Sequence, residues 1–233
     1  QTGQGQNTAR QAMVQAGIAK ETPAYTINKV CGSGLKAIAL GAQSIMTGQA
    51  EVVLAGGQEN MSMVLMVLFK VRWGYRMELT GVGQIYDLMV FDGLYEIFYG
   101  YHMGVTAENI ARLYNISRED QDRLAALSHA RALKGIQDGL FAQEIVPISV
   151  KAGRQMVDFA QDERPMETSL EKMAKLKPAF AKDGTVTAGN ASGIKDGAAY
   201  FVLASADAAA KAGQKPMARM VSYAVAGVPN DIM

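Results

Sequence analysis

The segment INKVCGSGLKAI, residues 27–38, decides how the rest of the chain is interpreted. Just before it, residues 23–28 alternate between apolar and polar positions, which predicts a strand. Residues 33–46 then form an apolar, alanine-rich run with few charges, which predicts a helix buried on more than one side. A short strand is expected at residues 51–55, closed by two glycines. A strand, a helix and a strand in this order are typical of a parallel sheet covered by helices.

The only cysteine, Cys31, lies in the turn between the first expected strand and the helix. A side chain in that place lies beside the free N–H groups and the positive end of the helix, which stabilise a thiolate. Gly32 and Gly34 would let another backbone or a ligand approach closely. A lone cysteine is more often an inert core residue. The local pattern therefore leaves two interpretations open, a nucleophile and a core residue.

Composition narrows the class of protein. Of the 233 residues, 49% are apolar and 19% are charged, which is enough for a sizeable core and excludes a disordered chain. A net charge of +1 gives no field for binding nucleic acid or an anionic membrane. The longest apolar run, residues 63–69, is far shorter than the ~20 residues that span a bilayer. One cysteine excludes an internal disulfide and favours a reducing, cytoplasmic setting, and with two histidines it cannot make a dedicated zinc site.

Helical and strand-like segments follow one another along the rest of the chain. Helices are expected at residues 8–17, 106–114, 118–135 and 206–212. Thr106 can cap the second of these, and Ser117 with Asp120 has the spacing of a capping box before the third. Strands are expected at residues 144–150, 198–205 and 218–226. Loop-rich or irregular structure is expected at residues 61–103, 151–177 and 184–196.

Both ends of the sequence are atypical of a complete protein. It begins with Gln1 in a polar stretch, without an initiator methionine, and closes on a turn-like tail, residues 227–233, directly after an expected strand. We therefore expect a piece of a longer chain.

Five blocks of the sequence resemble the thiolase family. The first is the cysteine segment itself, which resembles the acyl-enzyme signature of that family. The others are AGGQENMS, YGYHMG followed by TAEN, MAKLKPAF and TVTAGNASG, at residues 55–62, 99–109, 173–180 and 185–193. They come in family order at family spacing and cover nearly the whole chain except about residues 64–90. The YGYHMG block is similar to a stretch typical of the biosynthetic branch, the acetyl-CoA acetyltransferases.

The resemblance implies a reaction in which a cysteine thiolate attacks a 3-ketoacyl-CoA, releases acetyl-CoA and holds the acyl group until free CoA takes it. In the reverse direction, two acetyl-CoA molecules condense to acetoacetyl-CoA and CoA. Carried onto this chain, the nucleophile is Cys31, and its backbone N–H is one donor of an oxyanion hole. CoA thioesters are then substrates, and no cofactor is expected.

The resemblance also implies which residues bind the substrate. His102 and Met103 match positions that line the CoA and acyl pocket, and Leu94 matches another apolar contact. Ala188 and Ser192 match the loop that contacts the pantetheine arm, and Phe180 matches a residue near the adenine end. Arg164 corresponds to a nucleotide-contacting arginine, with the local spacing off by one. Taken without the resemblance, His102 is interpreted as a core histidine and the loop as an ordinary turn before a strand.

The chain also departs from the family. Thiolases carry a histidine that activates the nucleophile, an asparagine that positions a catalytic water and a second cysteine that shuttles the α-proton. No Gly-His-Pro and no second cysteine occur here, and the only histidines are His102 and His129. His129 matches no catalytic position and is interpreted as part of a solvated helix face. Lys195 also stands where a small polar residue is more usual.

Taken together, we expect an α/β chain with a thiolase-like fold, a mixed sheet covered by helices, and an inserted α+β loop domain. The expected domains are an N-terminal domain at residues 1–60, the loop domain at 61–194, a return to the N-terminal domain at 195–215, and the start of a C-terminal domain at 216–233. In biosynthetic thiolases the region of residues 64–90 joins two dimers, so a homodimer or homotetramer is implied.

Two other functions stay open. One is a catalytically incomplete CoA-binding or assembly module that uses the retained pocket and dimer surface. The other is a condensing enzyme of the ketoacyl-synthase type, which shares the cysteine nucleophile on the same general fold. A nicotinamide or nucleotide enzyme is disfavoured, because no G-x-G-x-x-G follows a strand and no Walker sequence occurs.

Overall fold

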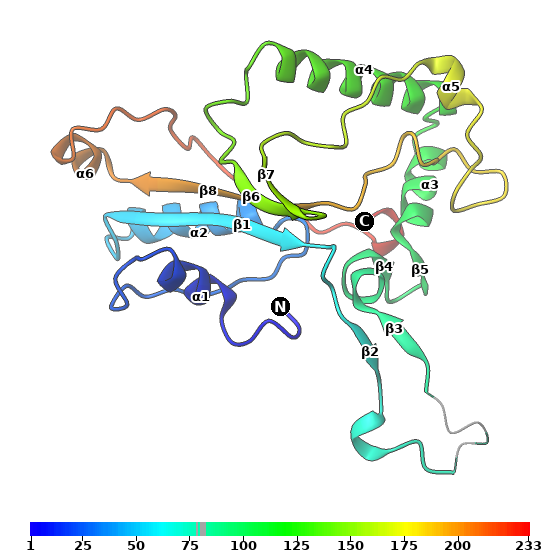
Figure 1. Ribbon diagram of the computed structural model, residues 1–233, viewed down its shortest axis with the longest axis horizontal. Helices are drawn as coiled ribbons and strands as arrows, with labels where there is room; N and C mark the ends of the chain where they lie inside the picture. Colours follow the sequence, from blue (N-terminus) through cyan, green and yellow to red (C-terminus); the bar gives the residue numbers. More distant parts are fainter. Residues whose placement is uncertain (78, 80–82) are drawn as a thin grey trace. The chain divides into compact units, whose positions relative to one another are not determined.

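The computed structural model describes residues 1–77, 79 and 83–233 (Figure 1). The chain divides into two compact units, which are described separately. The first unit comprises Gln1–Leu94 and Ile194–Gly227, and the second comprises Tyr95–Gly193 and Val228–Met233. The expected loop domain, residues 61–194, ends close to the boundary at which the chain returns from the second unit to the first, between Gly193 and Ile194. The domain assignment itself stays a prediction. Among the described residues, no helix combines the length and the apolar character that crossing a membrane requires.

The first unit is built on a two-stranded antiparallel sheet. Its strands are β1 (Val52–Asn60) and β8 (Asp196–Ala204), in register from Val52 opposite Ala204 to Asn60 opposite Asp196. Helix α2 (Ser33–Met46) packs against both strands of this sheet. Helix α1 (Thr8–Gln15) lies beside α2, and α6 (Ala206–Lys211) follows β8 and contacts it (Figure 1).

Small residues set the distance between α2 and the sheet. Ala39 and Gly41 are buried on the helix, and Ala55 is buried on β1. A Cβ at Gly41 would lie 2.9 Å from Leu203 Cδ1 and 3.1 Å from Val53 Cγ1, closer than real side chains pack. The alanine-rich composition that predicted a buried helix is therefore what lets α2 approach both strands.

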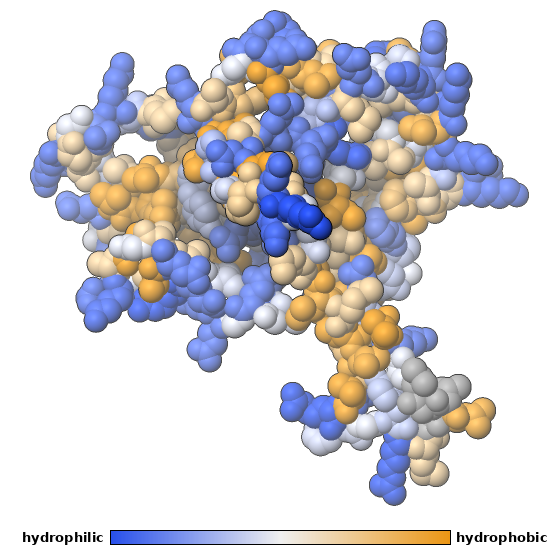
Figure 2. All heavy atoms as spheres, viewed as in Figure 1, coloured by the Kyte–Doolittle hydropathy of each residue, from blue (hydrophilic) through white to orange (hydrophobic). Residues whose placement is uncertain are grey.

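A hairpin continues the first unit after β1. Strand β2 (Met66–Leu68) pairs antiparallel with β3 (Ile85–Asp87), and between them lies a 3₁₀ turn, Val71–Trp73. A π-helical segment, Met89–Leu94, follows β3. The rings of Phe69, Tyr86 and Phe91 pack together, with centroids 4.8 to 5.6 Å apart. Apolar side chains gather on the outside of this hairpin (Figure 2), including the exposed Met66 and Ile85.

The longest elements of the second unit are two helices. A short hairpin of β4 (Tyr95–Glu96) and β5 (Tyr101–His102) leads into α3 (Met103–Leu113), which is followed by α4 (Arg118–Gln137). The hairpin of β6 (Ile148–Ala152) and β7 (Gln155–Phe159) is antiparallel, and α5 (Leu170–Ala174) packs against α4. A final 3₁₀ turn, Asn230–Ile232, contacts α3, where Asn109 Nδ2 donates to Asp231 O at 2.9 Å.

Two of the expected strands are wrong. Residues 23–28 and 218–226 form no strand, because no neighbouring segment among the described residues supplies the ladder of backbone hydrogen bonds that a strand needs. Residues 23–28 are tied to α1 by side chains instead. Asn7 Nδ2 donates to Ala24 O at 2.9 Å, and Ala9 N donates to Thr26 Oγ1 at 3.0 Å. Consequently β1 pairs antiparallel with β8 and not with a strand before α2.

Other expectations hold in outline and differ at the boundaries. The N-cap of α3 is His102 and not Thr106, which is buried three residues inside the helix with no hydrogen-bond partner for its hydroxyl. Residues 151–177 contain β7 and α5, so they are more regular than expected. The Ser117 cap is confirmed, because its Oγ accepts from Asp120 N at 3.1 Å. Gly139 ends the helical region with a positive φ of +69°.

Candidate active site

Cys31 lies directly before the first turn of α2 and is exposed. The residue before it, Val30, has a φ of +47°, in the left-handed region. A β-branched residue rarely adopts this conformation, which costs on the order of 1–3 kcal/mol and persists only where the surroundings impose it. The strain therefore marks the turn that presents the cysteine.

Hydrogen bonds hold this turn in its strained form. Lys29 N donates to Ser33 Oγ at 2.8 Å, and the Ser33 hydroxyl donates in turn to Val30 O at 2.7 Å. Val30 N donates to Asn28 Oδ1 at 2.8 Å. Side chains on both sides of Cys31 thus fix the backbone around it without occupying its thiol.

The start of α2 can stabilise negative charge at the cysteine. Lys36 N donates to Gly32 O at 3.0 Å and begins the regular bonding of the helix. Gly32 N and Ser33 N, at the start of α2, already donate to Lys29 O and Val30 O at 3.0 and 3.1 Å, so it is the helix dipole that favours an anion at this end. A thiolate at Cys31, or an oxyanion beside it, is the kind of charge that this end accommodates.

The glycines after Cys31 allow the close approach that the sequence predicted. A Cβ at Gly57 of β1 would lie 3.3 Å from Gly34 Cα, so the two backbones are nearly in contact. The end of the sheet therefore lies against the first turn of α2, which leaves little freedom for the turn to move.

Six of the other expected residues lie in the second unit, among them the pair His102 and Phe180. Their rings stack with centroids 4.7 Å apart and planes 18° apart. His102 Nδ1 accepts from Gly104 N at 3.0 Å and caps α3, so the neutral ring carries its proton on Nε2. Gly104 has no side chain because a Cβ there would overlap the Phe180 ring. Met103 is the first residue of the helix that this pair begins.

The segment Thr185–Gly193 forms a loop with a buried side and an exposed side. Val186 and Thr187 are buried, Thr187 completely, whereas Ala188 and Ser192 are exposed. Thr187 Oγ1 accepts from Gly189 N at 3.1 Å, and Asn190 Oδ1 accepts from Thr187 N at 2.8 Å. These hydrogen bonds within the loop fix its backbone, and Ala188 and Ser192, which the family resemblance assigns to substrate binding, lie on its exposed side.

Glu108 of α3 holds the first residues of this loop. Its side chain is 4% exposed, and its carboxylate accepts from Thr185 N at 2.8 and 2.9 Å and from Val186 N at 2.8 Å. The Thr185 hydroxyl donates to Oε2 at 2.9 Å. Burial by itself raises the pKa of Glu108, but the hydrogen bonds from Val186 and Thr185, with the nearby Arg112 charge, outweigh it and leave the pKa below its usual value.

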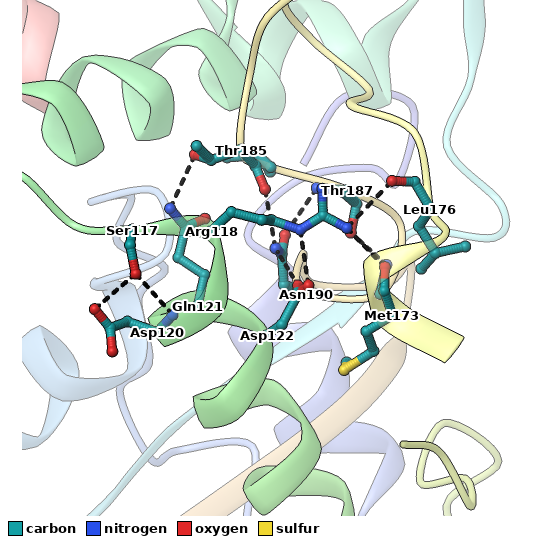
Figure 3. Close-up of polar contacts among 12 residues, drawn as sticks. Ser117, Arg118, Asp120, Gln121, Asp122, Met173, Leu176, Thr185, Thr187 and Asn190 are labelled. Atoms are coloured by element: carbon teal, nitrogen blue, oxygen red, sulfur yellow. Dashed lines mark hydrogen bonds and ion pairs between the residues drawn. The ribbon is translucent and has the colours of Figure 1, made fainter. Parts of the chain in front are cut away.

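Helix α4 holds the same loop from a second direction (Figure 3). Asp122, 4% exposed, accepts from Asn190 Nδ2 at 2.9 Å and from Arg118 Nε at 2.8 Å. Arg118 also donates to Met173 O at 2.6 Å and Leu176 O at 3.1 Å, which ties the end of α5 and the residues just after it to the start of α4. Gln121 Nε2 donates to the Thr185 hydroxyl at 2.9 Å.

Arg164 lies over the exposed side of the loop. Its Nη2 donates to the carbonyls of Ala188 and Ala191, both at 3.4 Å, and its guanidinium lies against Gly193. Arg164 therefore packs on the loop that carries Ala188 and Ser192.

The predicted site residues thus fall in two sets. Cys31 and Leu94, the last residue of the π-helical segment, belong to the first unit. The other six, His102, Met103, Arg164, Phe180, Ala188 and Ser192, belong to the second unit. His129, interpreted as solvated, is half-buried, and its Nδ1 accepts from Met166 N at 3.3 Å.

Sequence reasoning missed the residues that hold the loop, Glu108 and Asp122. A signal was present, because Gly104, Glu108 and Ala111 recur at helical spacing on one buried face of α3, and a glutamate on such a face needs partners.

Comparison with known proteins identifies the relatives of this chain. Residues 1–207 match the model of the thiolase N-terminal domain. The chain is 51% identical over 233 residues to the acetyl-CoA acetyltransferase of Syntrophomonas wolfei, and 51% identical over 235 residues to that of Escherichia coli. Each comparison covers 100% of this chain and 59% of the relative.

A solved structure agrees with the sequence comparisons. The crystal structure of the Bacillus anthracis acetyl-CoA acetyltransferase matches with a TM-score of 0.93 at 45% identity, covering 100% of this chain and 58% of that one. The chain therefore spans less than two thirds of the length of the relatives it matches, and its α/β architecture is the thiolase fold that the sequence predicted. By family model, sequence identity and fold, the chain belongs to the thiolase family.

Proposed function

We propose that this chain takes part in acyl transfer between CoA thioesters, with Cys31 as the residue that carries the acyl group. The observation that carries the proposal is the turn before α2, where an exposed cysteine follows a strained Val30 and lies at a helix N-terminus. Strained backbone residues cluster at active sites and ligand clamps. The acetyl-CoA acetyltransferases that are 51% identical to this chain support CoA thioesters as its substrates.

In the proposed reaction the Cys31 thiolate attacks the carbonyl carbon of acetyl-CoA. A bond forms between Sγ and that carbon, the bond from the carbon to the CoA sulfur breaks, and CoA takes up the proton that Cys31 gave up. The backbone N–H of Cys31 and the positive end of the α2 dipole stabilise the oxyanion of the tetrahedral intermediate. Because one thioester is exchanged for another, substrate and acyl-enzyme are close in energy.

The other predicted residues bind the substrate in this proposal. His102 and Met103 contact the CoA thioester near its acyl group, and Nε2–H of His102 is available as a donor because Nδ1 already caps α3. Leu94 of the first unit supplies a separate apolar contact. Ala188 and Ser192 contact the pantetheine arm from the exposed side of the loop. Arg164 contacts the nucleotide end, whereas Phe180, whose ring centroid is 4.7 Å from that of His102, contacts the same part of the substrate as His102. The family match over residues 1–207 favours a thiolase over a ketoacyl-synthase type of condensing enzyme.

The 233-residue chain should acquire the acetyl group without completing a condensation. It has neither the Gly-His-Pro histidine nor the second cysteine that thiolases use as bases. General-base assistance is typically worth ~10² to 10⁴ in rate, so acetylation of Cys31 should be slow and acetoacetyl-CoA formation should stay at background. Formation of acetoacetyl-CoA that depends on Cys31 would contradict this expectation.

The test is the intact mass of the purified chain after incubation with acetyl-CoA, beside a Cys31→Ala variant. One acetyl group on the parent and none on the variant supports the proposal. An unmodified parent with a native circular dichroism spectrum refutes it. CoA binding that persists in Cys31→Ala, with no adduct on the parent, would instead support the non-catalytic CoA-binding module.

We also propose that the protein works in the cytoplasm and assembles as a homodimer or homotetramer. The apolar side chains exposed on the β2–β3 hairpin support assembly, because monomeric proteins rarely expose such patches (Figure 2). Light scattering should give a mass of two or four chains, and a monomer that stays soluble at high concentration would contradict this part of the proposal.

A further inference from the structure

We propose that Glu108 is a positioning residue that holds the Thr185–Gly193 loop ready for the pantetheine arm of CoA. The inference rests on the proposed function for the identity of the ligand, and on this structure for the role of the residue.

The contacts of Glu108 go beyond what helix stability needs. A buried carboxylate requires hydrogen bonds, but α3 could have met its packing needs with an apolar residue at this place. Glu108 instead receives two successive backbone N–H groups, from Thr185 and Val186, and the Thr185 hydroxyl. Both oxygens are engaged, so the direction in which the chain enters the loop is fixed.

The fixed entry determines what the loop displays. Behind Val186 the chain turns around Thr187 and Asn190, and Asn190 is held by Asp122 of α4. With the buried side fixed by two carboxylates from two helices, Ala188 and Ser192 are left on the exposed side. A preformed surface of this kind reduces the ordering cost that binding a flexible arm would otherwise carry.

Helix α3 also connects this loop to the other end of the proposed pocket. The same helix begins at His102, whose ring stacks on Phe180, and carries Glu108 further along. Glu108 therefore makes the loop part of the rigid element that holds the histidine.

The first test compares Glu108→Gln with Glu119→Gln, which makes the same chemical change at an exposed glutamate of α4. The amide keeps one acceptor and places an NH₂ group against the donors at Oε2. Hydrogen exchange should become about tenfold faster at the Thr185 and Val186 amides in Glu108→Gln, since hydrogen bonds to charged groups are among the stronger ones. Glu119→Gln should exchange like the parent.

The second test measures binding and chemistry separately. In Glu108→Gln, the dissociation constant of CoA by calorimetry and the acetyl-CoA concentration for half-maximal acetylation of Cys31 should both rise about tenfold. The limiting acetylation rate and the alkylation of Cys31 by iodoacetamide should stay at the parent values. A purely structural role would lower the amount of folded protein and leave the affinity of the folded fraction unchanged.

The outcomes distinguish this proposal from the proposed function. If the parent binds CoA but is never acetylated, the proposed acyl transfer fails and the calorimetry still decides the role of Glu108. Unchanged CoA affinity in Glu108→Gln overturns the positioning role, and so does a parent that binds no CoA. Should Glu108→Gln fail to fold, Thr185→Val removes the hydroxyl donor to Oε2 together with the acceptor of Gln121 Nε2, and a smaller change in the same direction is expected.

Discussion

Two ion pairs on α4, one buried beside the Thr185–Gly193 loop and one exposed, allow the contribution of the buried pair to stability to be measured against a matched control. Arg118–Asp122 and Lys134–Asp138 both join side chains four residues apart, with distances of 2.8 and 2.6 Å. The side chains of the first pair are 20% and 5% exposed, and those of the second are 73% and 43% exposed. Replacing each aspartate by asparagine makes one chemical change in two environments.

The buried pair should cost far more to break. Removing one partner of a buried pair costs about 3–5 kcal/mol, and Arg118 keeps its bonds to two carbonyls, so we expect about 2–3 kcal/mol for Asp122→Asn. The exposed pair is worth about 0.3–0.5 kcal/mol. Asp138 also lies at the negative end of α4, where losing its charge is slightly favourable, so Asp138→Asn should be nearly neutral.

Urea unfolding followed by circular dichroism measures this difference. With a slope of roughly 2 kcal/mol/M, Asp122→Asn should lower the midpoint by about 1–1.5 M and Asp138→Asn by less than about 0.3 M. The slope itself should stay at the parent value. Equal midpoints for the two variants would refute the reasoning, because burial would then have no bearing on the strength of the pair.

Three further changes have defined outcomes. The pKa of Glu108 lies below its usual value of 4.5, so its charge stabilises the fold above that pH, and this stabilisation is lost as the pH falls through the lowered pKa. The difference in unfolding free energy between the parent and Glu108→Gln should therefore be constant near neutrality and become smaller below about pH 4.5. Acid titrations followed by circular dichroism measure it. Gly104→Ala should destabilise the chain by about 1–3 kcal/mol and disrupt the His102–Phe180 stack, measured as a lower urea midpoint, and an unchanged midpoint would contradict the close packing. Ser117→Ala should cost about 1 kcal/mol through loss of the α4 cap, whereas Ser117→Asp should retain most of it.

Local sequence signals predicted the helices well. The limits of α2 follow from an apolar, alanine-rich run with few charges, and the start of α4 follows from Ser117 and the acidic residues after it. Both signals act within one or two turns of helix, so they can be seen in the sequence. The start of α3 was missed because its cap is a histidine, a residue that seldom takes this role.

Features that depend on distant partners could not be predicted in the same way. Alternation at residues 23–28 and 218–226 shows that a segment can be extended, but a strand also needs a neighbour. The contact of Glu108 with Thr185 joins residues 77 positions apart, and nothing in either local pattern indicates the other. The turn at Cys31 lies between these cases, because its glycines were informative and the strained Val30 was visible only in the structure.

The length of α3 sets a spacing that the protein cannot adjust. Glu108 lies five positions after Met103, which at 1.5 Å per residue places them about 7.5 Å apart along the helix axis. Inserting one residue between them would turn Glu108 by about 100° around the axis and away from Thr185, while moving the loop relative to the histidine. Substitutions along this helix can therefore be tolerated, but an insertion or deletion would change the distance between His102 and the Thr185–Gly193 loop. In the proposed pocket, that distance determines the length of thioester that fits.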